Sequence, residues 1–449
     1  MNTTTLTIEQ ASQTTHPTFA EAVRFWLKLG FISFGGPAGQ VAIMHTELVE
    51  RKGWLQEDRF LHALNFCMLL PGPEAQQLAT YTGWLLHGTK GGIAAGVLFV
   101  LPSAVILWLL SWLYVSYGNV PIIAALFYGL KPAVMALVAH AVVRIGGKAL
   151  KSRVSWAIAA ASFAATALGN VPFPLIIAAA TCIGLATQLS GKTSPILASA
   201  SSELSTAAHT VPSLRRSLIV IAVWGGLWIA PILAASLLRG NADILTQQGE
   251  FFSKAAMVTF GGAYSVLPYV AKEAAQHFHW LSAAQMMDGL GLAETTPGPL
   301  IMVVQFVGFV GAWNHALLAG STQPLLLATL GAGISTWVTF APCFLWIFLG
   351  TPYIEQLRSS RLISSALQAI TAAVVGVVLN LALWFSVHTI APSGFSWNSG
   401  NIALGSIDFF AFALAVVMFV GLWRYKWNVI AVIAAGAFIG AVYKLFLAN

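Results

Sequence analysis

Two motifs rich in glycine and proline occur twice in this chain at the same spacing. Phe34-Gly35-Gly36 precedes Pro71-Gly72-Pro73, and 226 positions later Phe260-Gly261-Gly262 precedes Pro297-Gly298-Pro299. Each proline removes a backbone donor and clashes with the preceding helical turn, so neither PGP segment fits inside one regular helix. Helices broken in this way expose N–H groups and a partial positive charge, and glycine lets a ligand approach the backbone. The motifs therefore predict a binding site for an oxyanion.

Basic side chains lie close to both Phe-Gly-Gly motifs. Lys28 and Lys254 each precede the motif by six residues, and Arg24 lies one helical turn before Lys28. Such a pair predicts two cations that face one pathway from opposite sides, although long side chains near a helix start can also extend to the membrane surface. Lys131 lies well inside a predicted membrane span, where a charge is costly unless it faces a cavity or a partner.

Two acidic side chains lie beside the PGP motifs. Glu74 follows the first motif directly, and Glu294 precedes the second by three residues. Acidic residues inside membrane spans are rare and often functional, so both are candidates for proton coupling or for pairing with Lys28 or Lys254. The alternative is that each carboxylate caps the N-terminus of a half-helix.

The composition indicates an all-α integral membrane protein. Of 449 residues, 57% are hydrophobic and only 8% are charged, whereas soluble domains are about 25% charged. The net charge of +7 is better explained by cytoplasmic loops and an anionic substrate than by binding to nucleic acid. Cys67, Cys182 and Cys343 stand singly in apolar runs, so we predict no disulfide framework, metal site or cofactor. The sequence has no hydrolase or Walker motif, which argues against an enzyme.

The chain contains an internal duplication. An ungapped shift of 226 positions aligns residues 25–73 with residues 251–299 at twelve identical positions of 49, including glycine, proline and tryptophan. The sequence therefore divides into a polar tail predicted to be disordered and cytoplasmic (1–20), an N-terminal repeat (21–190), a cytoplasmic linker (191–216) and a C-terminal repeat (217–449).

The distribution of charge predicts how the repeats are inserted in the membrane. Basic loops prefer the cytoplasm, which places residues 144–153, 190–216, 358–361 and 424–426 inside and the loops without basic residues outside. These assignments leave an odd number of crossings between the two copies, so the halves have opposite orientations. An inverted repeat with broken or re-entrant helices is the architecture of secondary transporters, with the site near the membrane midplane. The sequence leaves open whether the motif segments cross or re-enter.

These motifs resemble the signatures of the chromate ion transporter family. The first signature is similar to residues 34–40 (FGGPAGQ) followed by residues 71–74 (PGPE), and the second to residues 260–264 (FGGAY) followed by residues 296–299 (TPGP). The resemblance covers nearly the whole chain and matches the long, two-domain members. It implies a multi-pass carrier of the bacterial inner membrane that exports chromate and confers resistance, with sulfate as a related anion. The second copy has Ala263 in place of Pro37 and Leu300 in place of Glu74, so we expect an asymmetric site.

From these observations we predict a secondary transporter that exports chromate by alternating access. The alternatives are transport of sulfate or another oxyanion, a chromate/sulfate antiporter and, with less support, an anion channel or an intramembrane enzyme. The expected partners are the small anion and the lipid bilayer, and a homodimer is compatible with the sequence. The predicted pathway residues are Arg24, Lys28, Phe34, Gly35, Gly36, Pro37, Gln40, Pro71, Gly72, Pro73, Lys131, Lys254, Phe260, Gly261, Gly262, Pro297, Gly298 and Pro299, with Glu74 and Glu294 for proton coupling.

Overall fold

The structure, a computed structural model, describes residues 16–34, 36–118, 120–189, 213–351, 361–391 and 407–447. Within these ranges the chain is helical and contains no strand. Seven of the described helices are long and apolar enough to cross a membrane. The predicted all-α, polytopic membrane fold is confirmed.

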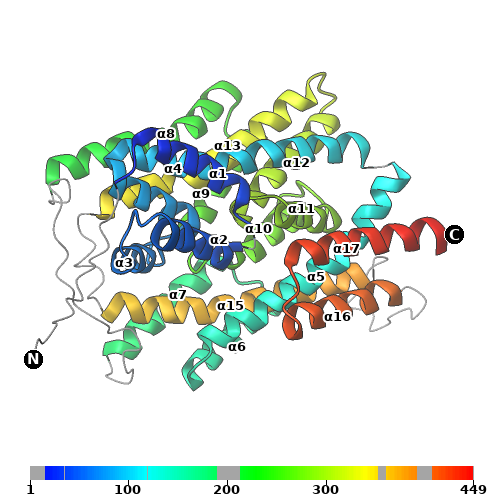
Figure 1. Ribbon diagram of the computed structural model, residues 1–449. Helices are drawn as coiled ribbons and strands as arrows, with labels where there is room; N and C mark the ends of the chain where they lie inside the picture. Colours follow the sequence, from blue (N-terminus) through cyan, green and yellow to red (C-terminus); the bar gives the residue numbers. More distant parts are fainter. Residues whose placement is uncertain are drawn as a thin grey trace, which may run out of the picture.

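The helices follow the same order in the two halves (Figure 1). Those of the first half are α1 (Phe19–Ile32), α2 (Gly36–His45), η1 (Thr46–Arg51), α3 (Glu57–Cys67), α4 (Glu74–Tyr117), α5 (Pro121–Ala149), α6 (Arg153–Ala167) and α7 (Phe173–Leu189). Those of the second half are α9 (Ile244–Met257), η3 (Ala263–Ser265), α10 (Leu267–Lys272), η4 (Glu273–His277), α11 (Ala283–Thr295), η5 (Leu300–Met302), α12 (Val303–Leu318), α13 (Pro324–Gly350), α15 (Arg361–Ile390), α16 (Phe409–Arg424), α17 (Val429–Val442) and η8 (Tyr443–Leu447). Helix α8 (Leu214–Arg239) connects the halves.

Each PGP motif separates two helices, as the two prolines require. The first lies between α3 and α4, and the second lies between α11 and the short η5 turn that leads into α12. Helix α4 is itself broken at His87 and Gly88, where the backbone leaves helical geometry. Its two arms then run back along each other, since a Cβ added to Gly83 would lie 2.5 Å from the carbonyl oxygen of Gly91. The second half repeats this hairpin with α12 and α13. A Cβ added to Gly308 would likewise lie 2.5 Å from the carbonyl oxygen of Gly331.

The Phe-Gly-Gly segments also turn back. The His87 ring contacts the carbonyl oxygen of Pro17, 3.1 Å from Nε2, so the turn of the α4 hairpin lies beside the start of α1. The Trp54 ring, which follows η1, packs edge-on against Phe25 of α1 at 5.3 Å between ring centroids. The segment α1–α2–η1 therefore folds back on itself, as expected for a re-entrant segment.

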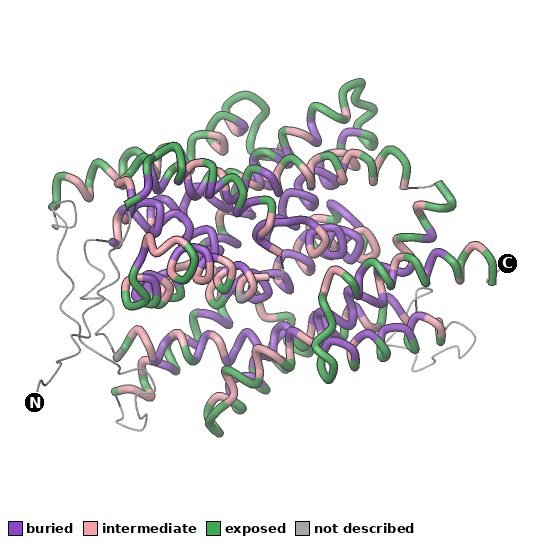
Figure 2. The backbone as a smooth tube through the Cα atoms, viewed as in Figure 1, coloured by how far each residue is buried: buried purple, intermediate pink, exposed green. Residues whose placement is uncertain are grey.

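The two halves exchange helices across their interface. Helix α15 of the second half packs against α6 and α7 of the first, and α5 of the first half packs against α16 and α17 of the second. In Figure 1, α3 lies toward the end where the N-terminus is marked, and α11 lies toward the C-terminal end. Buried residues concentrate where the re-entrant helices meet in the middle of the molecule (Figure 2). The inverted repeat predicted from charge and duplication agrees with this arrangement.

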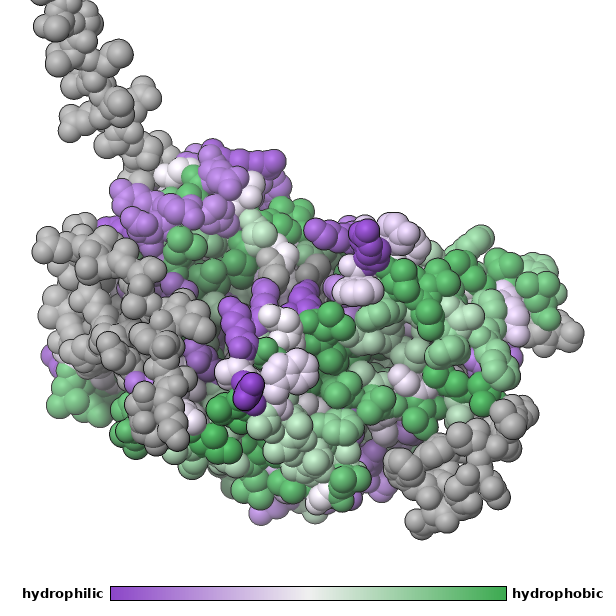
Figure 3. Space-filling view, turned by 90° about the horizontal axis from the view of Figure 1, so that it is seen from below, coloured by the Kyte–Doolittle hydropathy of each residue, from purple (hydrophilic) through white to green (hydrophobic). Residues whose placement is uncertain are grey.

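The periphery is apolar, as expected for a surface that contacts lipid. Helix α8 has no counterpart in the described part of the first half, and none of its most apolar 18-residue window is buried. Broad hydrophobic areas cover the face shown in Figure 3, with hydrophilic side chains gathered mainly toward one edge. Residues 1–15 of the predicted tail, most of the linker and the basic loop near residue 358 lie outside the described residues. The last residues of the predicted tail are ordered instead, since Thr18 caps α1 and the helix begins at Phe19.

Candidate functional site

The motifs of the two halves are joined by a reciprocal pair of backbone hydrogen bonds. The Gly72 N–H donates to the carbonyl oxygen of Thr259, and the Gly298 N–H donates to the carbonyl oxygen of Ser33, both at 2.7 Å. The shift of 226 residues that aligns the repeats converts one bond into the other. Each PGP motif is therefore held by the residue that precedes the Phe-Gly-Gly motif of the opposite half. We call these four residues the crossing.

The glycines of the crossing allow a very close approach of a helix. Gly72 and Gly298 have φ angles of +121° and +99°, which L-residues rarely adopt. A Cβ on Gly298 would lie 2.6 Å from the Cβ of Ser103 in α4, and one on Gly72 would lie 2.9 Å from the Sγ of Cys343 in α13. Ser103 and Cys343 each follow a proline inside their helix, so the duplication extends to these contacts as well.

One polar side chain connects the first-half motif to the crossing. The Gln40 amide of α2 donates to the carbonyl oxygen of Gly298 at 2.5 Å and to that of Ser33 at 3.4 Å. Around it, the hydroxyl oxygens of Ser33 and Ser103 and the amide oxygen of Gln40 are buried without a hydrogen-bond partner. Polar atoms in this state favour a polar ligand, because burying them unpaired is costly.

Two helix N-termini meet at the second Phe-Gly-Gly motif. A Cβ on Gly262 would lie 3.7 Å from the Pro37 ring and 3.8 Å from the Glu74 carboxylate. Pro37 is at the start of α2, and Glu74 is the first residue of α4. The starts of both helices, which carry partial positive charge, therefore lie near the Glu74 carboxylate.

A cluster of the buried Tyr264 with the half-buried Glu294 and Arg144 lies next to the second motif. The Tyr264 hydroxyl donates to the Glu294 carboxylate in a short hydrogen bond. The Arg144 guanidinium of α5 lies over the Tyr264 ring, 5.5 Å from its centroid, and interacts electrostatically with Glu294. One helical turn later on α5, the exposed Lys148 ammonium interacts electrostatically with Glu74. Successive turns of α5 thus carry cations from the surface toward the crossing.

The sequence profile of the chromate transporter family matches this chain in two segments, residues 20–185 and 246–441. The chain belongs to the chromate transporter family.

Relatives of known name support this membership over most of the chain. A chromate transport protein of Pseudomonas aeruginosa is 30% identical over 420 residues, which is 92% of this chain and 90% of the relative. A chromate transport protein of Cupriavidus metallidurans is 28% identical over 84% of this chain and 85% of its own length. An uncharacterized transporter of Methanocaldococcus jannaschii is 24% identical over 81% of this chain and 83% of its own length. These relatives are transporters, in agreement with the prediction that the chain is not an enzyme, and no solved structure matches.

In this member of the chromate transporter family, three of the predicted cations lie away from the crossing. Arg24 and Lys28 are exposed on α1, and Lys254 is exposed on α9. Lys254 lies 3.7 Å from the Glu250 carboxylate on its own helix. The buried face of α1 is formed instead by apolar residues such as Phe25 and Leu29. The structure therefore does not bring these cations together with the motifs or with Glu74 and Glu294.

The other predicted residues have different outcomes. Gly36 and Gly261 also have positive φ, and a Cβ on Gly261 would lie 3.7 Å from the Thr371 hydroxyl of α15. Gly35 lies outside the described residues. Lys131 is half-buried and interacts with Asp288 rather than with the crossing. Glu74 is the first residue of α4, and the N-cap position before it is occupied by Pro73, whose side chain makes no capping hydrogen bond.

Sequence reasoning missed the roles of Arg144 and Tyr264. Arg144 was interpreted only as part of a basic cytoplasmic cluster, and Tyr264 only as part of the family signature. Their contact joins α5 to η3 across 120 residues, and local spacing contains no signal for such a pair. A half-buried arginine one turn inside a basic helix end is the feature that singles Arg144 out.

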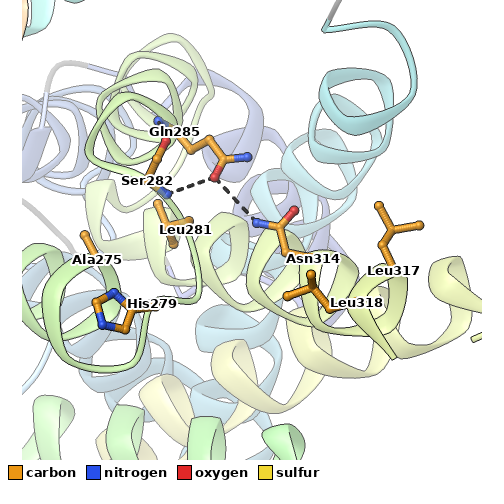
Figure 4. Close-up of a pocket in the computed structure, with 8 residues that line it drawn as sticks. All are labelled: Ala275, His279, Leu281, Ser282, Gln285, Asn314, Leu317 and Leu318. Carbon is orange, nitrogen blue, oxygen red and sulfur yellow. Dashed lines mark hydrogen bonds between the residues drawn. The ribbon is translucent and has the colours of Figure 1, made fainter. Parts of the chain in front are cut away.

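A surface pocket lies where α11 begins and α12 ends, and it is separate from the crossing (Figure 4). Its polar groups are already engaged, since the Asn314 amide donates to the carbonyl oxygen of Trp280 at 2.9 Å. The Ser282 N–H and the Gln285 side chain belong to the N-terminal capping box of α11. None of the residues that line this pocket belongs to the crossing, so we do not assign transport to it.

Proposed function

We propose that this protein exports chromate from the cytoplasm of a bacterium across the inner membrane by alternating access and so confers chromate resistance. The observation that supports this proposal best is the position of the second Phe-Gly-Gly segment between two groups of residues: Gly262 lies beside Pro37 and Glu74 at the starts of α2 and α4, and Tyr264 lies beside Arg144. Fixed backbone dipoles and a guanidinium suit a small anion of high charge, because a guanidinium offers several donors in a fixed geometry. The names of the relatives from Pseudomonas aeruginosa and Cupriavidus metallidurans support chromate as that anion.

The membrane potential supplies enough energy for export of a dianion. Moving one elementary charge across 100 mV is worth about 2.3 kcal/mol, so a dianion leaving a negative interior gains roughly 4.6 kcal/mol. Lys148 and Arg144 form a basic approach to the crossing along α5, which favours loading from the cytoplasmic side predicted for the basic end of that helix. A dianion that moves alone gains this full amount, whereas one that moves together with a proton carries a single net charge and gains about half of it.

Glu74 is the residue that links this transport to protons. Its carboxylate lies where an oxyanion meets the helix N-termini, and two negative charges at one place repel each other. A proton bound to Glu74 removes this repulsion, so anion binding and protonation of Glu74 favour each other. Glu294 contributes in the same way through Tyr264, with Arg144 as the nearby cation.

The test is chromate uptake into inverted membrane vesicles, with and without excess sulfate and with a protonophore. We expect saturable uptake in wild type and a loss of about tenfold or more in Arg144→Gln. Lys28→Ala is the matched comparison because sequence reasoning selected Lys28, and we expect it to retain most of its flux. Normal flux in Arg144→Gln together with lost flux in Lys28→Ala would move the anion site to α1.

The same assay separates the remaining alternatives. Sulfate transport without chromate transport would identify a sulfate carrier, and exchange that requires sulfate on the opposite side would identify an antiporter. Flux that does not saturate would indicate a channel. Crosslinking in the native membrane would reveal a homodimer.

A further inference from the structure

A buried carboxylate lies on α11, apart from the crossing. Asp288 of α11 is only 5% exposed. One of its carboxylate oxygens accepts a hydrogen bond from the Tyr114 hydroxyl of α4 at 2.9 Å. The other oxygen, Oδ1, is buried without a hydrogen-bond partner. A carboxylate held in this way is costly to keep charged, because burial penalises an ion with unsatisfied oxygens.

Lys131 of α5 is the cation that faces this carboxylate. Its ammonium interacts electrostatically with Asp288, but the ion pairs shorter than 4.0 Å among the described residues do not include the two. Among the described parts of the helices packed on α11, Tyr114 and Lys131 are the titratable groups that act on Asp288. From α15, the Thr389 hydroxyl contacts the sulfur of the neighbouring Met287 at 3.3 Å.

The duplication places a titratable side chain at the same point of the first repeat. Asp288 is the fifth residue after the start of α11, and His62 is the fifth residue after the start of α3. His62 is buried as well. At the other positions around the PGP motifs, the two repeats do not both have a titratable residue; Glu74, for example, corresponds to Leu300. A buried side chain of titratable type therefore occurs at the same position of α3 and α11.

We propose that Asp288 is a proton-binding site in the outer half of the transport pathway, with Tyr114 and Lys131 as the residues that position its carboxyl group. The ligand is a proton rather than a metal ion, because the Lys131 ammonium repels cations and the described residues contain no cluster of three metal-ligating side chains. The site lies outward of Glu294 by six residues of α11, about 9 Å along the helix axis. Proton binding by Asp288 does not depend on the proposed transport function. Only the movement of this proton together with the anion rests on that function.

The experiment varies the pH of the vesicle lumen, which contacts the outer face of the protein in inverted vesicles, at a clamped potential and fixed external pH. We expect chromate flux in wild type to change with luminal pH by up to about tenfold per unit, the limit for one titrating group. In the flux that remains, Asp288→Asn should lose this dependence on luminal pH, because its side chain cannot exchange a proton. Tyr114→Phe, which keeps the ring, should shift the midpoint of the dependence. Glu250→Gln removes an exposed carboxylate from α9 of the same half and should behave like wild type.

A spectroscopic measurement keeps the proposal testable if transport fails. The infrared difference spectrum between acidic and neutral pH should contain a carboxyl band that disappears in Asp288→Asn and moves in Tyr114→Phe. Absence of chromate flux in wild type would overturn the transport function and leave the infrared result to decide the proton site. Unchanged luminal pH dependence in a folded Asp288→Asn protein, or identical infrared spectra in wild type and Asp288→Asn, would overturn the proposal.

Discussion

Replacing Gly298 by alanine tests the geometry of the crossing directly. Gly298 has a φ angle of +99°, and the Cβ that alanine adds would lie 2.6 Å from the Cβ of Ser103. The backbone cannot move away freely, because the Gly298 N–H donates to Ser33 and its carbonyl oxygen accepts from Gln40. We therefore expect the substitution to strain both the motif and helix α4.

The expected loss of stability follows from two effects. A left-handed backbone conformation costs an alanine about 1–2 kcal/mol, and overpacking a filled site costs about 1–3 kcal/mol more. Gly298→Ala should therefore destabilise the protein by roughly 2–5 kcal/mol. Gly320→Ala is the matched control, because Gly320 has a φ angle of +66° but no atom within 4 Å of its added Cβ. It should show only the smaller backbone effect.

The assay is thermal denaturation of the purified protein in detergent, with chromate flux measured in parallel. A second substitution sharpens it, since the nearest obstacle is the Cβ of Ser103 and its Oγ is farther away at 3.0 Å. Ser103→Gly should relieve part of the loss in Gly298→Ala, with a coupling of about 1–3 kcal/mol, whereas Ser103→Ala should relieve little. Equal stability of Gly298→Ala and Gly320→Ala, or equal rescue by both substitutions at Ser103, would refute the reasoning.

Three further predictions concern single side chains. Arg144→Gln should reduce chromate flux by about tenfold or more, while Arg153→Gln, at the exposed start of α6, should not; equal loss in both would point to net charge instead. Gln40→Leu should lower the denaturation temperature by a loss of about 1–3 kcal/mol, because the Gly298 carbonyl oxygen loses its donor; an unchanged temperature would contradict this. The Thr18 N–H and hydroxyl lower the pKa of Glu21, so this contribution to stability is present above the unfolded pKa and lost as pH falls through the folded pKa. Thr18→Ala should weaken that acid dependence in denaturation measured against pH, and an identical acid limb would argue against the cap.

The backbone architecture was predictable because its cause is local. Two closely spaced prolines break a helix, so the sequence predicts the interruptions between α3 and α4 and between α11 and α12. The duplication then fixed which segments are equivalent, and the basic loops indicated opposite insertion. The sequence left open whether the broken segments cross or re-enter, because that depends on contacts such as Trp54 with Phe25 and His87 with Pro17.

The side chains at the crossing were predicted less well, for two different reasons. The exposure of Lys28 on α1 was predictable from the sequence. Phe25 and Leu29 are spaced for a buried face, and Arg24 and Lys28, one residue before each of them, lie on the exposed side. The role of Arg144 was not predictable, because its contact with Tyr264 is set by how α5 of one half packs against the other half.

The backbone of the crossing is symmetric between the halves, whereas the charged side chains near it are not. Exchange of conformations between the halves preserves the crossing, because the bonds of Gly72 and Gly298 are equivalent. The charges do not exchange: Leu300 takes the place of Glu74, and a shift of 240 residues, which aligns α5 with α15 at their starts, puts Trp384 in the place of Arg144. In the proposed site the guanidinium of Arg144 and the carboxylate of Glu74 therefore come from the first half, and Glu294 comes from the second. Trp384→Arg combined with Arg144→Gln would place the arginine in the other half. A symmetric mechanism predicts that chromate flux is retained in this double variant, whereas an asymmetric site predicts that flux is lost.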